Sequence, residues 1–228
     1  GEQDWRRLPR KPITPRKADD LIAAEMRAGS QSVEPSPLTT DEQFIRRVTL
    51  DLTGQLPSPA QVADFVSAGE SDKRGKLIDD LLQTEAYARH WARFWRDVVS
   101  ARITNRRSMG LTRSFEEWLY ERLRAGASWK EITRSILQAE GELRFTLNTP
   151  SAENGALFFL VAHDGEEAEE RAAETSSVFL GIQIQCAQCH DHPTENWKRQ
   201  QFHEFAAYFS RIKFEQLFDE SKKKALSG

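Results

Sequence analysis

One stretch of this chain predicts both a helix and the motif that follows it. The stretch reads Glu166-Glu-Ala-Glu-Glu-Arg-Ala-Ala-Glu-Thr-Ser-Ser-Val-Phe-Leu180, followed by Gly181 and then by Cys186-Ala-Gln-Cys-His190. The first part is acidic at its start and apolar at its end. That order favours a helix, because negative charges stabilise a helix N-terminus. Gly181 is expected to end this helix, and Ile182 and Ile184 lead into a motif that holds both cysteines of the chain.

Apolar residues recur at helical spacing on both sides of this stretch, and no convincing series of strands is present. The sequence therefore predicts a mainly α fold, a multi-helix domain with the C-x-x-C-H residues in a loop or turn between the last helices. Only the apolar run Ala156–Ala162 is ambiguous between a buried strand and a helical turn. The other helices are expected at Pro15–Ala28, Thr40–Leu52, Pro59–Val66, Ser71–Leu82, Ala86–Val99, around Phe115–Leu123, around Trp129–Leu137 and at Arg199–Ile212.

The helix expected at Ala86–Val99 carries an aromatic stripe at helical period. We interpret this stripe as core packing rather than as a cofactor site, because large rings on one helix face most often fill a hydrophobic core. Its members are Tyr87, Trp91, Phe94, Trp95 and Val98.

Composition and charge narrow the class of protein. Hydrophobic residues make up 39% and charged residues 29%, which is typical of a globular protein with a solvated surface. The net charge of −3 argues against a dedicated nucleic-acid binder. No run of about 18 apolar residues predicts a membrane span. We expect an irregular basic segment at 1–13, a single helical domain at 14–212, and a polar linker at 213–228 toward a downstream domain.

The C-x-x-C-H spacing points to covalent haem attachment. Two thiols at this spacing reach the two vinyl groups of a haem, and the adjacent imidazole binds iron. The sequence predicts haem c on Cys186 and Cys189 with His190 as the axial iron ligand. Aromatic residues nearby could exclude water from the porphyrin, namely Phe179, Trp197, Phe202, Phe205 and Phe209.

Two other interpretations of the cysteines stay open. A disulfide could join Cys186 and Cys189, although a thioredoxin-like dithiol would need a βαβ setting that this helical pattern lacks. Zinc could be held by both cysteines with His192 and His203, although this spacing matches no common zinc finger.

Further metal ligands are candidates around the motif. His192 lies two residues after His190 and could contact a haem propionate, a backbone carbonyl or a second metal, or simply form a turn. His203 and Met109 are candidates for the second axial position, and His163, His90 and Met26 are further candidates. An open distal face would instead favour binding of small ligands.

Longer stretches carry a family resemblance. The chain resembles a family of secreted planctomycete cytochrome-like domains of the second type, catalogued as domains of unknown function, and the resemblance covers roughly Ile13 to Ile212. The matching stretches are Phe44-Ile-Arg-Arg-Val-Thr-Leu-Asp-Leu-Thr-Gly-Gln-Leu-Pro-Ser-Pro59, Leu77-Ile-Asp-Asp-Leu-Leu82, Trp91-Ala-Arg-Phe-Trp-Arg-Asp97, Phe179-Leu-Gly-Ile-Gln-Ile-Gln-Cys-Ala-Gln-Cys-His-Asp-His-Pro193, Trp197 and Phe205-Ala-Ala-Tyr-Phe209.

The resemblance implies a large exported protein in which this domain precedes a second uncharacterised domain. Cys186, Cys189, His190, His192 and Pro193 match the family motif position by position. His203 stands where the family usually has an aromatic residue, and His163 where it usually has an acidic one, which weakens both as ligands common to the family.

The sequence thus predicts an exported, periplasmic or cell-surface domain, because haem c is attached outside the cytoplasm, although the chain opens with Gly1-Glu2 and shows no signal peptide. Electron transfer or redox sensing is the expected function, with a redox partner protein and the downstream domain of the same polypeptide as partners. The alternatives are a non-haem interaction or scaffold domain, with a disulfide or a metal site, and a peroxidase-like haem enzyme.

Overall fold

The computed structural model describes residues 13–28, 33, 35–101, 103, 111–141, 155–162 and 168–212. Its contacts divide the chain into two compact units, residues 1–44 and 45–228. All regular structure in these described ranges is helical, so the prediction of a mainly α fold is confirmed. The expected basic N-terminal segment, apart from Ile13, and the expected C-terminal linker lie outside the described residues.

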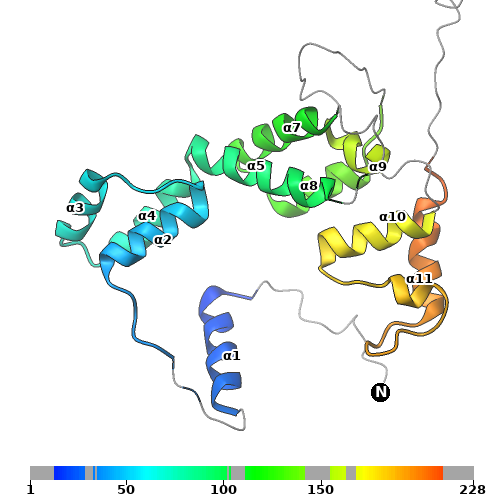
Figure 1. Ribbon diagram of the computed structural model, residues 1–228, viewed down its shortest axis with the longest axis horizontal. Coiled ribbons are helices and arrows are strands. Elements are labelled where there is room, and N and C mark those ends of the chain that lie inside the picture. Colours follow the sequence, from blue (N-terminus) through cyan, green and yellow to red (C-terminus); the bar gives the residue numbers. More distant parts are fainter. Residues whose placement is uncertain are drawn as a thin grey trace, which may run out of the picture. The chain divides into compact units, whose positions relative to one another are not determined.

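The helices up to residue 137 follow the sequence closely, because local signals set their ends. Ser58, which precedes the first helical residue Pro59, forms a capping box with Gln61 in the first turn. Ser128 and Glu131 form a second capping box, and the Thr84 side chain accepts a hydrogen bond from the Tyr87 backbone N–H. The helices are α1 (Pro15–Ala28), α2 (Asp41–Thr53), α3 (Pro59–Ser67), α4 (Lys73–Leu82), α5 (Glu85–Ser100), α7 (Thr112–Arg124) and α8 (Trp129–Leu137) (Figure 1).

The later part of the chain is also helical but less regular. The ambiguous apolar run forms the short helices η2 (Gly155–Leu157) and α9 (Phe158–Ala162), so a strand there is wrong. Helix α10 (Ala168–Thr175) changes into a π-helical turn, η3 (Ser176–Leu180). Helix α11 (Arg199–Ala206) ends earlier than expected and continues as the 3₁₀ turn η5 (Ala207–Phe209). None of the described helices is long and apolar enough to cross a membrane.

The main core forms between α5 and α7 and is closed by α8 and α9. Small residues of α5 let α7 approach closely, since Ala88 and Ala92 are fully buried against it. Phe115 is also fully buried and packs on Phe158 at a ring centroid distance of 5.0 Å. The other buried members are Val99, Leu111, Trp118, Leu119, Tyr120, Ile132, Ile136, Phe159, Leu160 and Ala162.

Charged residues line the edge of the same helix pair. Arg89 on α5 donates from Nη1 to both carboxylate oxygens of Glu117 on α7, at 2.9 and 3.0 Å. Arg93 and Arg96 both pair with Glu116. These ion pairs fix which faces of α5 and α7 meet, although partly exposed pairs contribute little free energy.

The aromatic stripe of α5 lies beside the main core rather than inside it. Trp95 stacks on Trp129 at 4.1 Å and is partly buried, whereas Phe94 is 45% exposed. The expectation of core packing is therefore wrong for Phe94. The reason is that the alanines of α5, not its large rings, face α7.

A second, smaller core joins α10, α11 and the segment between them (Figure 1). Phe202 and Ala206 of α11 pack with Ala172 and Ala173 of α10. The remaining buried members are Ile184, Ala187 and Phe209. Because Ile184 and Ala187 border or belong to the cysteine motif, this core positions the candidate site.

Candidate functional site

The cysteine motif is built on a short 3₁₀ helix, η4 (Gln185–Gln188), which lies between η3 and α11. Gly181 ends η3 with φ of 66°, a left-handed conformation that glycine adopts without steric cost. The Ile182 N–H then donates to the Ser176 carbonyl at 3.2 Å. Ile184 and Ala187 are 4% and 0% exposed, so their burial anchors η4 in the second core.

Both cysteines lie on the exposed surface of this turn as free thiols. Cys186 is within η4 and Cys189 follows its last residue. Side chains three residues apart nearly eclipse one another in a 3₁₀ helix. Cys186 and Cys189 are three residues apart, a spacing that favours thiols on one side of the turn, whereas Ala187 between them is buried.

His190 is exposed, and its ring is oriented by its own backbone neighbour. Its Nδ1 lies 2.7 Å from the Asp191 carbonyl oxygen. A carbonyl oxygen can only accept, so Nδ1 carries the proton and Nε2 keeps its lone pair. An imidazole held in this tautomer is ready to bind a metal through Nε2.

Asp191 connects the motif to the start of α11. Its carboxylate accepts from the Lys198 Nζ at 2.9 Å and from the Arg199 backbone N–H at 3.0 Å. Both hydrogen bonds hold the pKa of Asp191 below its usual value, and the one from Lys198 has the larger effect. Asp191 thus caps the first turn of α11 from across the loop.

His192 organises the turn that follows. Its Nδ1 accepts from the backbone N–H groups of Thr194 and Glu195, at 3.4 and 3.0 Å. Its own backbone N–H donates to the Trp197 carbonyl at 2.8 Å. Among the roles expected for His192 from the sequence, these hydrogen bonds at Nδ1 correspond to the formation of a turn.

His203 lies on α11 beside the motif. Its Nε2 is 3.0 Å from the Gln188 carbonyl oxygen, and its Nδ1 is 3.9 Å from the Glu169 carboxylate. Met109 and His163, the other candidates named for the distal side, lie outside the described residues. His90 is on α5, and Met26 is on α1.

A family model matches residues 17–214. The chain belongs to the PSCyt2 family. The family is described as proteins of unknown function (DUF1549), and the match extends over nearly the same range as the resemblance seen in the sequence. No curated protein and no solved structure matches the chain.

In this PSCyt2 domain, a closed metal cage and covalent haem would place different demands on the donor residues. Among the described residues, no group of three or more Cys, His, Asp or Glu side chains is placed to hold one ion. Covalent attachment needs something different, namely two accessible thiols on one side and one imidazole with a free nitrogen. Cys186 and Cys189 are exposed free thiols, and His190 follows them directly.

The aromatic residues expected around the haem have varied surroundings. Phe202 and Phe209 are buried in the second core, and Trp197 and Phe205 are partly buried against it. Phe179 packs against the main core instead. The rings that follow the motif in the chain therefore pack in the same core as Ile184 and Ala187.

Sequence reasoning missed the residues that hold the motif in place. Asp191 caps a helix that starts eight residues later, whereas a capping side chain normally precedes its helix directly. Gln188 contributes through its backbone carbonyl, for which side-chain identity gives no signal. Only the apolar Ile184 and Ala187 could have been recognised as anchors from their place in the pattern.

The cap made by Asp191 gives a pH-dependent prediction. A folded-state pKa below the unfolded value of about 3.9 means that this carboxylate stabilises the fold above about pH 4. That contribution is lost as the pH falls through the lower folded pKa. We therefore expect Asp191→Ala to lower the melting temperature at about pH 6, with the difference from the wild type shrinking as the pH falls below about 4.

Thermal unfolding followed by circular dichroism across this pH range measures the effect. Glu195→Ala is the matched control, because Glu195 lies in the same exposed loop and contributes to it through its backbone N–H. A difference between Asp191→Ala and wild type that stays constant with pH would contradict the capping role.

Proposed function

We propose that this PSCyt2 domain is an exported c-type haem domain that serves electron transfer or redox sensing within a larger protein. One observation supports the proposal: two exposed thiols, one within a 3₁₀ turn and one just after it, are followed directly by an imidazole whose Nδ1 contacts a backbone carbonyl. Covalent haem attachment requires these groups in this order along the chain.

Each residue of the motif then has one role. Cys186 and Cys189 would form the two thioether bonds, and His190 would bind iron through Nε2. The Asp191 carbonyl keeps the proton of His190 on Nδ1 and strengthens the ligand. The haem itself would supply a one-electron couple.

Electron transfer or sensing fits this arrangement better than catalysis. The partners would be a redox protein and a downstream domain of the same polypeptide. A peroxidase-like reaction would require an open distal face and groups to move protons there. His203 and His192, the nearest histidines to the motif in sequence, use ring nitrogens to hold the backbone instead.

The experiment is an absorption spectrum of the full chain exported in a host with haem-attachment machinery. A sharp Soret band that remains with the polypeptide after denaturation is expected. Colourless protein from that host, in which a known c-type cytochrome matures normally, would contradict the proposal.

The two histidines of the motif should behave differently in the loaded protein. His190→Ala removes the proposed axial ligand, so we expect the haem to stay covalently bound with its Soret band shifted and its midpoint potential changed. His192→Ala removes a turn contact, so we expect lower thermal stability with a nearly unchanged spectrum. Spectroelectrochemistry of both variants makes the comparison, and equal spectra for His190→Ala and wild type would exclude His190 as ligand.

A scaffold domain without haem is the second candidate. Its supporting observation is that Cys186 and Cys189 are both exposed and lie three residues apart at a short turn, which also suits a disulfide. Mass spectrometry of exported protein distinguishes the two, because a disulfide lowers the mass by two hydrogen atoms, whereas thiol addition to the vinyl groups adds the whole mass of the haem.

A further inference from the structure

The last carbonyl of η4 has two partners on α11. A carbonyl at a helix C-terminus has no partner within its own helix. The Gln188 carbonyl oxygen lies 3.0 Å from the Nε2 of His203 and 3.4 Å from the Nε of Arg199. Both donors therefore close the end of the turn that lies between the two cysteines.

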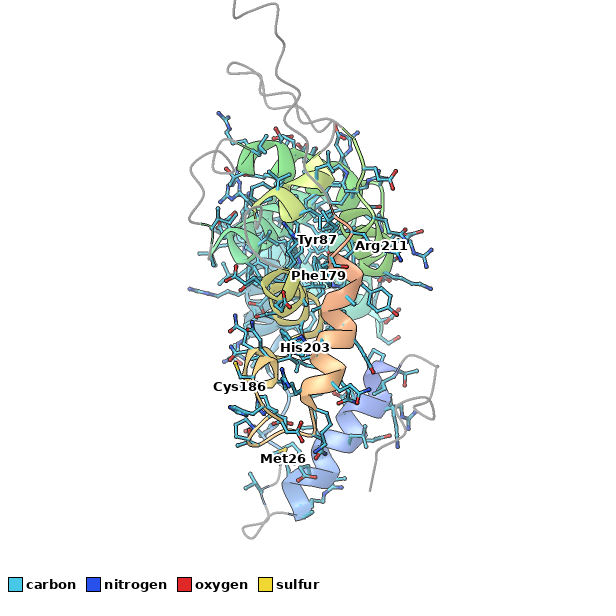
Figure 2. All side chains as sticks on the ribbon, turned by 90° about the vertical axis from the view of Figure 1, so that its right-hand side faces the viewer. Met26, Tyr87, Phe179, Cys186, His203 and Arg211 are labelled. Carbon is cyan, nitrogen blue, oxygen red and sulfur yellow. The ribbon has the colours of Figure 1, made fainter. Side chains whose placement is uncertain are left out.

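The two donors reach this carbonyl from one face of α11. Arg199 and His203 are four residues apart, and residues at that spacing lie next to each other on a helix surface. Figure 2 shows His203 on α11 and Cys186 on the adjoining segment, η4. A single helix face thus clamps the cysteine turn.

The ring of His203 has a neighbour on each of two sides. It meets the ring of Phe202 edge-on at 5.4 Å, and Phe202 is 2% exposed. On its other side, Nδ1 lies 3.9 Å from the Glu169 carboxylate of α10. The contact with Phe202 places the His203 ring beside the second core.

The clamp acts on the site through the planar peptide group. The Gln188 carbonyl and the Cys189 N–H belong to one rigid plane. Fixing that carbonyl fixes the direction in which the chain enters Cys189 and His190. Between Cys186 and Gln188, the buried Ala187 holds the backbone. Both thiols and the imidazole therefore project from a backbone that is fastened at two points.

We propose that His203 is a positioning residue, which together with Arg199 holds the Gln188–Cys189 peptide so that both thiols and His190 keep one arrangement. The residue acts through the backbone rather than at a metal. The proposal rests on the proposed function only in naming haem as the group that the site receives. The clamp itself is a property of the protein without haem.

The test uses the full chain without haem and Cd²⁺ as probe, because thiolates bind this soft metal. His203→Phe keeps an aromatic ring but removes the N–H donor. We expect its Cd²⁺ affinity to fall by about 10- to 100-fold, the usual effect of losing a group that orients metal ligands. Thiolate-to-metal absorbance in a competition titration gives the affinity.

Two further variants separate positioning from general packing. His203→Gln keeps an amide N–H that can reach the same carbonyl, so it should restore most of the affinity. Gln200→Ala is the matched control on α11, because Gln200 donates only to the exposed Glu204. It should bind Cd²⁺ as the wild type does.

Each outcome decides the question. Wild-type affinity in folded His203→Phe, or a loss in His203→Gln equal to that in His203→Phe, overturns the clamp. If circular dichroism shows that His203→Phe does not fold, Arg199→Met replaces it, and unchanged affinity in that variant overturns the joint role. The failure of haem attachment is a separate result, since colourless exported wild-type protein would refute haem without changing the Cd²⁺ comparison.

Discussion

Replacing both Cys186 and Cys189 with serine should abolish covalent haem attachment in exported protein. The reason is chemical: a hydroxyl does not form the thioether bond that a thiol forms with a vinyl group. The double variant should lose its Soret band and its iron, because no other cysteine exists in the chain to take over. Haem-stained denaturing gels and iron analysis measure the loss.

The single variants and a control make this result specific. Cys186→Ser and Cys189→Ser should each leave at most one thioether bond and a large drop in haem yield. Gln183→Ser, at an exposed position just before the motif, should keep full colour. Unchanged iron and colour in the double variant would mean that the haem, if present, is held by other residues.

The second large effect concerns the main core. Phe115 is fully buried on α7 and packs on Trp118 and Phe158. Phe115→Ala should lower the free energy of unfolding by about 3–5 kcal/mol, because it removes apolar contact and leaves a cavity. Denaturant unfolding followed by tryptophan fluorescence measures the change.

Phe94→Ala is the matched control for Phe115→Ala. Phe94 is 45% exposed on α5 and touches Trp91 and Trp95 at its edge. Its truncation should cost about 1 kcal/mol, the value of aromatic edge contacts. Equal losses in the two variants would contradict the placement of the main core between α5 and α7.

The sequence predicted helices best where local signals act. Pro15–Ala28 matches α1 at both ends, and the capping residues before α3 and α8 mark helix starts that depend on neighbouring residues alone. The run at 156–162 remained ambiguous, because a fully buried segment is apolar on all sides and shows no period. The alanines of α5 are buried, and Phe94 is not, because the alanines face α7. The periodicity of one helix does not show which of its faces a second helix will cover.

The candidate site shows the same division. Cys186, Cys189 and His190 could be recognised from spacing, because covalent chemistry depends on which residues are adjacent in the chain. The helical form of η4 and the contacts of Gln188, Asp191 and His203 could not. These contacts join residues separated by eight to fifteen positions, and they depend on how α11 packs beside the motif.

The second core has a consequence for how the molecule opens. It is small, and it includes Ile184 and Ala187, which belong to the backbone that carries the thiols. Local unfolding proceeds in cooperative units, and the least buried units open first. When the second core between α10 and α11 opens, Cys186 and Cys189 therefore lose their alignment together. The α5–α7 pair can stay folded in that event.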